Sequence, residues 1–369
     1  MKTLHCERCG VRVFFENVTC GNCGASLGFV PSELGMGAFE VTAEGVWSRL
    51  SDRPAQRPCA NYTSYQVCNW MVPAESGDVH CVSCRTTQIL PSLDKPQNLL
   101  HWATIEQSKR RMVYSLLSMG LPVVPRTEDT TLGLAFRFLE DQPSKRVLTG
   151  HDSGVITLNV AEADNAHREK VRAAMHEPYR TLLGHFRHEV GHYYWDVLID
   201  NTEWLPRYRK LFGDERADYE TALKQHYDSP RADWQDQFVS VYASSHPWED
   251  WAECWAHYMH LQDGLETAAA WGLQLDNALP GSPPVRASAL GCDPDPSTVG
   301  QALVDRWLPI SQFVNAMARS MGVHDAYPFV VPPSVIHKLE FIHQVVCAYC
   351  SSKSAPAGDV RLPTDACTA

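Results

Sequence analysis

Residues 185–195 read HFRHEVGHYYW, and the interpretation of the whole chain starts from this stretch. His188 and His192 are four residues apart, so a helix would place their imidazoles on one face, about one turn apart. Glu189 follows the first histidine, where a carboxylate can take a proton from a zinc-bound water. Apolar residues recur at helical spacing around this motif: Leu182, Leu183, Phe186, Val190, Tyr194, Val197 and Leu198. The stretch therefore predicts an amphipathic helix that carries two metal ligands and a general base.

A catalytic zinc site uses three protein ligands and a water, so a third ligand is required. Trp195 and Leu198 stand where the extended metzincin motif has glycine and histidine, which excludes that class. The other common solution is a glutamate on a later helix. Residues 247–257 read PWEDWAECWAH and begin with proline, which is favoured in the first turn of a helix. We expect the third ligand on this second helix.

Two glutamates of the second helix compete for this role. Glu249 and Glu253 would share one polar face with His257 and His260, within about 80°. We predict that Glu249 is the third ligand and that Glu253 accepts a hydrogen bond from the free N–H of a ligand histidine. The reverse assignment stays open, and Asp250 is a poorer third choice. The opposite face should lie in the core: Trp248, Trp251, Ala252, Trp255 and Met259.

Eight of the thirteen cysteines lie in the first 84 residues, and four of them form two closely spaced pairs. A Cys-x-x-Cys turn places both sulfurs on one side of a tight loop, and two such turns complete a tetrahedral thiolate site. Val11, Val13 and Phe15 alternate between the pairs, which predicts a hairpin there. The pattern predicts a structural zinc ion held by Cys6, Cys9, Cys20 and Cys23.

The other four N-terminal cysteines are less regularly spaced. Only Cys81 and Cys84 form a close pair, and His80 could compete as a ligand. We predict a second structural zinc ion held by Cys59, Cys68, Cys81 and Cys84. The sequence leaves open whether the two sites interleave. Closed four-cysteine sites fold a domain rather than catalyse, so we favour a structural role over partner docking.

Charge and hydropathy argue against two classes of protein, those that bind nucleic acid and those that span a membrane. A net charge of −11 argues against a large nucleic-acid footprint, which needs clustered Lys and Arg. No stretch approaches the roughly 18 apolar residues of a membrane-spanning helix, so we expect no membrane insertion. The N-terminus has no secretory signal pattern, which predicts a cytoplasmic protein with reduced thiols. In that compartment the cysteines favour metal sites over disulfides, and the pair Cys347 and Cys350 is a weak redox signal.

The expected fold is α+β: a zincin-like, mainly helical domain with a small sheet, preceded by a cysteine-rich zinc ribbon. A linker falls around 85–103, and Thr104 with Gln107 forms a capping-box pattern that predicts a helix start. Alternating runs at 134–138 and 156–160 predict two strands. The predicted divisions are 1–90 for the ribbon region, 100–350 for the catalytic domain and 351–369 for an unstructured tail.

Four segments together resemble the bacterial family of zinc-binding metallopeptidases that carry an N-terminal zinc ribbon. These segments are Cys6–Gly28, Cys68–Trp70, Arg187–Trp195 and His246–Tyr258. The resemblance covers most of the chain and implies a zincin-like catalytic domain of the glutamate-ligand type. It does not supply a substrate.

The predicted activity is zinc-dependent hydrolysis of peptide or peptide-like amide bonds, with Glu189 as general base. The expected cofactors are one catalytic and two structural zinc ions, and the expected partner is a peptide or protein substrate. Candidate donors to the oxyanion are Tyr219, Tyr242, His257 and Tyr258. Two alternatives remain: a non-peptide amidase or deacylase that uses the same site, and a zinc-ribbon adaptor with a vestigial zincin domain.

Overall fold

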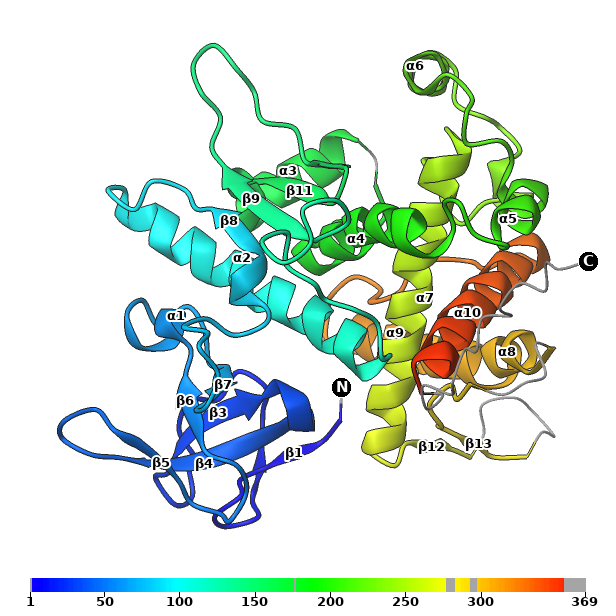
Figure 1. Cartoon of the computed structure of the whole chain (residues 1–369). Coiled ribbons are helices and arrows are strands. Elements are labelled where there is room, and N and C mark those ends of the chain that lie inside the picture. Colours follow the sequence, from blue (N-terminus) through cyan, green and yellow to red (C-terminus); the bar gives the residue numbers. More distant parts are fainter. Residues whose placement is uncertain (1, 176, 277–282, 293–296, 355–369) are drawn as a thin grey trace, which may run out of the picture.

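The computed structural model describes residues 2–175, 177–276, 283–292 and 297–354. The chain forms a small N-terminal β module and a larger, mainly helical part (Figure 1). The long helix α2 (Pro96–Ser118) lies between the two parts. The expected α+β fold, with a cysteine-rich ribbon before a helical domain that has a small sheet, is confirmed.

The N-terminal module is a set of short antiparallel strands, in which β3 pairs with β4 and β4 with β5, while β1 pairs with β2 and β6 with β7. Its elements are β1 (Leu4–His5), β2 (Arg12–Val13), β3 (Ser26–Val30), β4 (Gly35–Val41), β5 (Trp47–Arg49), β6 (Gln56–Pro58), α1 (Ala60–Thr63) and β7 (Met71–Pro73).

Each of the two N-terminal cysteine pairs lies in a tight turn. The first pair occupies the turn of the β1–β2 hairpin, and the second lies between the bridged residues Thr19 and Ser26. Gly10 and Gly24 follow the two pairs, both with φ of +71°, a left-handed conformation that favours glycine. The prediction of a hairpin between the two cysteine pairs is therefore wrong. The strand that follows the first pair, β2, instead pairs with β1, which precedes that pair.

The N-terminal module packs directly against α2. The ring of Tyr114 on α2 contacts Phe15 and Phe29, with centroids 5.6 and 5.9 Å apart. Further along the module, the Arg110 guanidinium donates to the carbonyl of Val67. Because α2 in turn packs against helix α4 (Leu182–Leu198), one helix connects the module to the helix of the His-Glu-x-x-His motif.

The larger part has one four-stranded sheet, in the order β10-β11-β9-β8. Strand β10 is antiparallel to β11, whereas β11 and β8 are both parallel to β9. The strands are β8 (Thr87–Ile89), β9 (Ala135–Leu139), β10 (Gly150–Asp152) and β11 (Val155–Asn159); a separate hairpin joins β12 (Gln274–Leu275) to β13 (Val285–Arg286). Both predicted strand runs are confirmed, as β9 and β11.

Helices make up most of the larger part. Besides α2 and α4 they are α3 (Asn165–Ala174), α5 (Leu205–Phe212), α6 (Tyr219–Asp228), α7 (Pro247–Ala270), α8 (Ser297–Ala302), α9 (Leu308–Ser320) and α10 (Pro333–Ser354). Helix α10 thus enters the predicted tail, whose residues 355–369 lie outside the described part. Within the described ranges, no helix combines the length and apolar character that crossing a bilayer needs.

The predicted start of α2 at Thr104 is wrong. The helix begins eight residues earlier, at Pro96, and the Thr104 hydroxyl donates to the Leu100 carbonyl inside it. A threonine that bonds back to the carbonyl four residues earlier sits within a helix, so its spacing from Gln107 only mimics a capping box.

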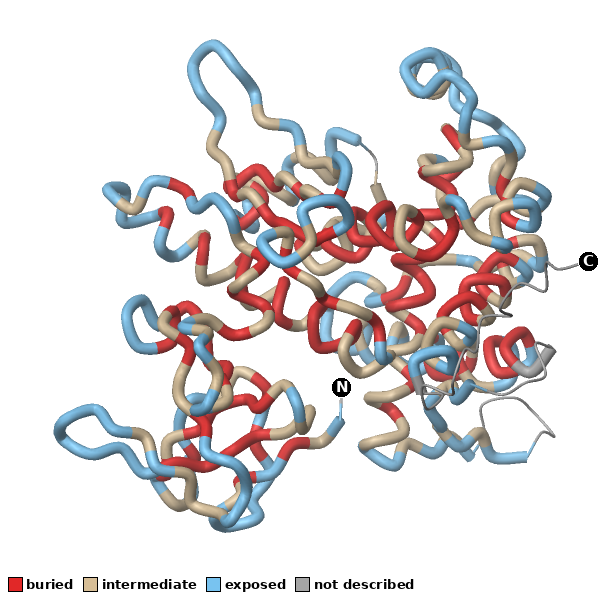
Figure 2. The backbone as a smooth tube through the Cα atoms, in the orientation of Figure 1, coloured by how far each residue is buried: buried red, intermediate tan, exposed pale blue. Residues whose placement is uncertain are grey.

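Helices α4 and α7 pack on each other, and both are buried over most of this contact (Figure 2). Of the predicted apolar stripe on α7, four residues have at most trace exposure: Trp251, Ala252, Trp255 and Met259. The two helices approach at Gly191, whose carbonyl accepts a hydrogen bond of 2.8 Å from the Trp251 indole. A Cβ atom at Gly191 would lie 3.0 Å from both the Ala252 Cα and the Trp255 Cβ. Only glycine fits this crossing without movement.

We expect Gly191→Ala to destabilise the protein by about 1–3 kcal/mol, because the added methyl overpacks the α4–α7 contact. The direction of the change in stability is informative, because alanine in an uncrowded helix would stabilise the protein by about 1 kcal/mol relative to glycine. The thermal midpoint should fall by several degrees, whereas Gly77→Ala, where a Cβ meets nothing within 4 Å, should leave it unchanged. A midpoint that rises for Gly191→Ala would contradict this packing.

Candidate metal centre

Helix α4 presents the His-Glu-x-x-His motif from a firmly capped start. The Thr181 hydroxyl accepts a hydrogen bond of 3.0 Å from the backbone N–H of Gly184, as an N-cap residue does. From there the helix runs to Leu198, so His188, Glu189 and His192 lie within one continuous helical segment. His192 and Glu189 are buried, with 3% and 8% exposure. The predicted helix and the common face of its two histidines are confirmed.

Helix α7 brings a glutamate to the same point. The helix starts at Pro247, and the ring of His246 caps it by accepting the Trp248 backbone N–H at 3.1 Å. Glu249 then lies in the first turn with 1% exposure. Its Oε2 is 3.0 Å from His188 Nε2 and 3.4 Å from His192 Nε2. Two helices distant in sequence thus bring three donor atoms within 4.8 Å of one another.

Two observations indicate that these three residues suit a metal ion: the chemistry of their side chains, and a buried carboxylate oxygen that lacks a hydrogen bond. Glu249 Oε2 is buried and makes no hydrogen bond of acceptable geometry to any described residue. A buried carboxylate oxygen without a donor is costly unless a cation binds it. Two imidazole nitrogens and one carboxylate oxygen form the ligand set of hydrolytic zinc sites.

Two other acids in the first two turns of α7 point away from this convergence. Glu253 Oε1 is 2.8 Å from His188 Nδ1, and its Oε2 accepts a hydrogen bond of 2.7 Å from the Ser240 hydroxyl. Asp250 instead pairs with Lys338 of α10 at 2.6 Å, with both side chains almost fully buried. The geometry therefore groups Glu249 with the two histidines, leaves Glu253 behind His188, and removes Asp250 from the site.

Burial governs the charge of the general-base candidate. Loss of solvent raises the pKa of Glu189 to about 7, with nearby Glu249 and Glu253 adding to the rise and His188 opposing it. The carboxyl group thus lies in a low-dielectric environment next to the three convergent donor atoms, where the charge of a bound cation would act strongly on it.

Two aromatic residues complete the site in ways that the sequence did not indicate. Trp248 was predicted to lie in the core, but it is only half-buried at the edge of the core, and its ring packs against His192 with centroids 3.9 Å apart. As the second residue of α7 it precedes the part of the helix that packs into the core. His151 of β10 stacks on His192, with centroids 6.0 Å apart, and its ring lies equally close to that of Trp248.

The four candidate oxyanion donors separate into two groups. The Tyr219 hydroxyl donates to Glu249 Oε1 at 2.6 Å, and the Tyr242 ring lies 5.9 Å from that of His188. By contrast, His257 Nδ1 shares a hydrogen bond with Tyr327, and the Tyr258 hydroxyl contacts His343 of α10. Only the two tyrosines outside α7 are near the convergent donor atoms.

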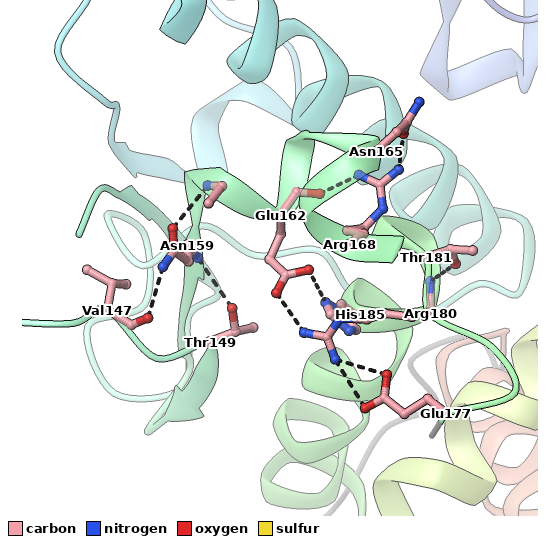
Figure 3. A network of polar contacts seen from close by, with 12 residues as sticks. Val147, Thr149, Asn159, Glu162, Asn165, Arg168, Glu177, Arg180, Thr181 and His185 are labelled. Carbon is pink, nitrogen blue, oxygen red and sulfur yellow. Dashed lines mark hydrogen bonds and ion pairs between the residues drawn. The ribbon is translucent and has the colours of Figure 1, made fainter. Parts of the chain in front are cut away.

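A network of ion pairs fixes the segment that leads into α4 (Figure 3). Arg180 binds Glu162, which lies in the turn after β11, at 2.6 Å and Glu177 at 3.1 Å. His185, in the first turn of α4, lies 3.7 Å from the same Glu162 carboxylate. Because Arg180 immediately precedes the cap residue Thr181, this network ties the entry of α4 to the sheet.

The cysteines of the N-terminal module gather into two separate clusters. The sulfurs of Cys6, Cys9, Cys20 and Cys23 lie within 4.8 Å of one another, and so do those of Cys59, Cys68, Cys81 and Cys84. The two groups do not interleave, and His80 belongs to neither. Both sets have the composition of closed structural zinc sites.

The comparisons with known proteins agree with this geometry. The family described as "Putative zinc-binding metallo-peptidase" matches residues 98–345, and a zinc-ribbon domain family matches residues 3–95. Two similar proteins are "Uncharacterized protein Rv2568c" of Mycobacterium tuberculosis strain H37Rv and "Uncharacterized protein Mb2598c" of Mycobacterium bovis. Each is 46% identical over 348 residues, which cover 94% of this chain and 95% of the relative. No solved structure matches the chain. The family match spans both helices of the metal centre, and the chain belongs to this zinc-binding metallopeptidase family with an N-terminal zinc ribbon.

Proposed function

We propose that the chain is a zinc-dependent peptidase whose metal ion is held by His188, His192 and Glu249. The observation that carries this proposal is the convergence of their Nε2, Nε2 and Oε2 atoms from two packed helices. Three protein ligands leave one position for water, which distinguishes a catalytic site from the closed four-cysteine clusters.

The bound zinc ion would lower the pKa of a water molecule to about 7 and polarise the scissile carbonyl. Glu189 would take up the water proton; its position directly after His188 on α4 and its shielding from bulk solvent support this role. The same carboxyl group would then deliver the proton to the leaving amine. Glu253 would hold His188 Nδ1–H, which presents Nε2 to the metal and fixes the ring orientation.

We extend the proposal to the N-terminal module, where the two four-cysteine clusters would each hold a structural zinc ion. Such closed sites stabilise a fold and leave no position for substrate or water. Their contribution to activity would be indirect, through the contact of the module with α2 and of α2 with α4.

A substrate screen tests the proposed reaction. The zinc-loaded wild-type chain is incubated with a mixture of peptides of defined sequence and, separately, with acyl-amide compounds that contain no peptide bond. The proposal requires new amino termini in the peptide mixture, which chelation removes and added zinc restores. Cleavage confined to the non-peptide amides would replace the peptidase assignment by an amidase.

We expect Glu253→Gln to weaken zinc binding at the catalytic site about 10–100-fold, because His188 loses the charged acceptor of its Nδ1–H. The affinity is measured by competition with a chromophoric chelator. Glu220→Gln, on the exposed helix α6, is the matched control and should bind zinc like the wild type. Equal affinities for the two variants would remove Glu253 from its proposed role.

Tyr219 is the best-placed donor to the oxyanion, because its hydroxyl already reaches the carboxylate of Glu249. At saturating zinc we expect Tyr219→Phe to lower kcat about 100-fold while KM stays close to that of the wild type. The zinc affinity should also fall, because the hydroxyl donates to the proposed ligand Glu249. Tyr227→Phe, from the same helix but with a 61% exposed side chain, serves as the control. A kcat for Tyr219→Phe that matches the control would show that the hydroxyl takes no part in the reaction.

A further inference from the structure

A third kind of sulfur cluster lies outside the metal centre and the ribbon. Cys292 is joined by a disulfide to Cys347 of α10, and His343 lies one helical turn before Cys347. The sequence predicted metal sites instead of disulfides, and for this pair the structure contradicts that prediction. Yet the ligand atoms of all three residues lie within 4.8 Å of one another.

His343 is the residue that a simple disulfide does not explain. Its ring is buried, with 3% exposure, and its Nε2 faces the Cys347 sulfur at 3.5 Å. Burial lowers the pKa of His343, against a smaller opposing effect of the Gly291 carbonyl. A neutral imidazole is the form that binds metal ions.

The two nitrogens of His343 have partners that allow either of two tautomers. Nδ1 is 2.9 Å from the Tyr258 hydroxyl, and Nε2 is 3.2 Å from the Gly291 carbonyl. With the proton on Nε2, the ring donates to Gly291 and accepts from Tyr258. With the proton on Nδ1, it donates to the Tyr258 oxygen and turns a free lone pair on Nε2 toward the sulfurs, which is how metal-bound histidines are held.

We propose that Cys292, His343 and Cys347 form a redox-controlled metal site. In the dithiol state, two thiolates and the His343 Nε2 bind a soft divalent ion such as Zn²⁺, with a fourth position left for water. In the disulfide state, the sulfurs are consumed and the ion leaves. This assignment is independent of the peptidase activity.

The two states interconvert by a balanced two-electron step. A peroxide such as hydrogen peroxide takes one electron from each thiolate and, with two protons, becomes two waters while the sulfur–sulfur bond forms. In the reverse direction, two molecules of a low-molecular-weight thiol supply two electrons and form their own disulfide. Cys292 is exposed, so both reagents and the metal ion can reach the pair.

The proposed site contacts α7, the helix that carries Glu249, through His343 of α10. Helix α10 packs along α7 (Figure 1), and the Tyr258 hydroxyl that contacts His343 belongs to the helix that carries Glu249 and Glu253. A change of tautomer at His343 therefore reverses the direction of a buried hydrogen bond between these two helices.

Zinc stoichiometry of the full chain tests the proposal. Wild type, Cys292→Ser and Cys350→Ser are reduced with a low-molecular-weight thiol, loaded with Zn²⁺, exchanged into metal-free buffer and analysed for zinc. Cys350 lies on α10 three residues from Cys347, outside the cluster, and is the matched control. We expect wild type and Cys350→Ser to hold one more zinc per chain than Cys292→Ser.

The same measurement after peroxide treatment completes the test. The other thiolate sites are common to all variants, so they cancel when the zinc content of wild type and Cys292→Ser is compared. After oxidation this difference should fall from one zinc per chain to none. Peptide mapping of the oxidised wild type should detect the Cys292–Cys347 disulfide. Cys347→Ser, which removes the other sulfur, should behave like Cys292→Ser. Equal zinc content of the reduced wild type and both cluster variants would overturn the proposal.

Discussion

Replacing Glu189 by glutamine is expected to reduce kcat/KM for a cleaved peptide about 1,000-fold without loss of zinc. A positioned general base typically contributes 10²- to 10⁴-fold, and glutamine has nearly the same shape but cannot accept the proton. Glu189 lies outside the group of three convergent ligand atoms, so its replacement should leave the metal in place. Steady-state kinetics and zinc analysis of the same preparation measure both quantities.

The control for this variant is Glu203→Gln, which makes the same chemical change at an exposed position after α4. It should retain wild-type activity. Two results would count against the assigned role: a Glu189→Gln enzyme as active as Glu203→Gln, or a loss of activity that simply follows a loss of zinc. The second result would make Glu189 a contributor to metal binding instead of the base.

Loss of one ribbon cysteine is expected to have the largest effect on stability. Cys59 is fully buried among three other cysteine sulfurs, and Cys59→Ala would open a closed site. Binding of structural zinc is worth about 10–16 kcal/mol in isolated zinc fingers, and a packed module should lose a smaller part of this. We expect a loss of about 5 kcal/mol and one zinc per chain, seen as a thermal midpoint lower by about 10 °C or more.

Cys254→Ala is the matched control, because Cys254 is also fully buried but belongs to no cluster among the described residues. It should keep all its zinc and lose about 1 kcal/mol. The effect of Cys59→Ala should reach the metal centre, since Val67 of the same module binds Arg110 on α2 and α2 packs against α4. A Cys59→Ala protein with unchanged zinc content and midpoint would show that the cluster holds no structural metal.

The sequence predicted the two helices of the metal centre because each has strong internal signals. The spacing of His188 and His192 requires a helix to bring both rings together, and Pro247 marks the start of the second helix. The choice between Glu249 and Glu253 needed the structure. Both lie on one helical face, and only the crossing of α4 over α7 decides which carboxylate meets both histidines.

Other features were not predictable because they depend on contacts between distant segments. Trp248 follows the helical pattern of a core residue, but it lies at the edge of the core, where its ring meets His192. Tyr219 reaches Glu249 from a separate helix, thirty residues earlier in the chain. The Cys292–Cys347 disulfide joins residues 55 positions apart, for which no local pattern exists.

The central claim is that His188, His192 and Glu249 bind a catalytic zinc ion, and zinc content of His192→Ala tests it most directly. Wild type and variant are loaded, exchanged and analysed side by side by elemental analysis, with far-ultraviolet circular dichroism to verify folding. We predict that His192→Ala holds one zinc fewer per chain than the wild type and hydrolyses no peptide. Equal zinc content in the two folded proteins would contradict the claim.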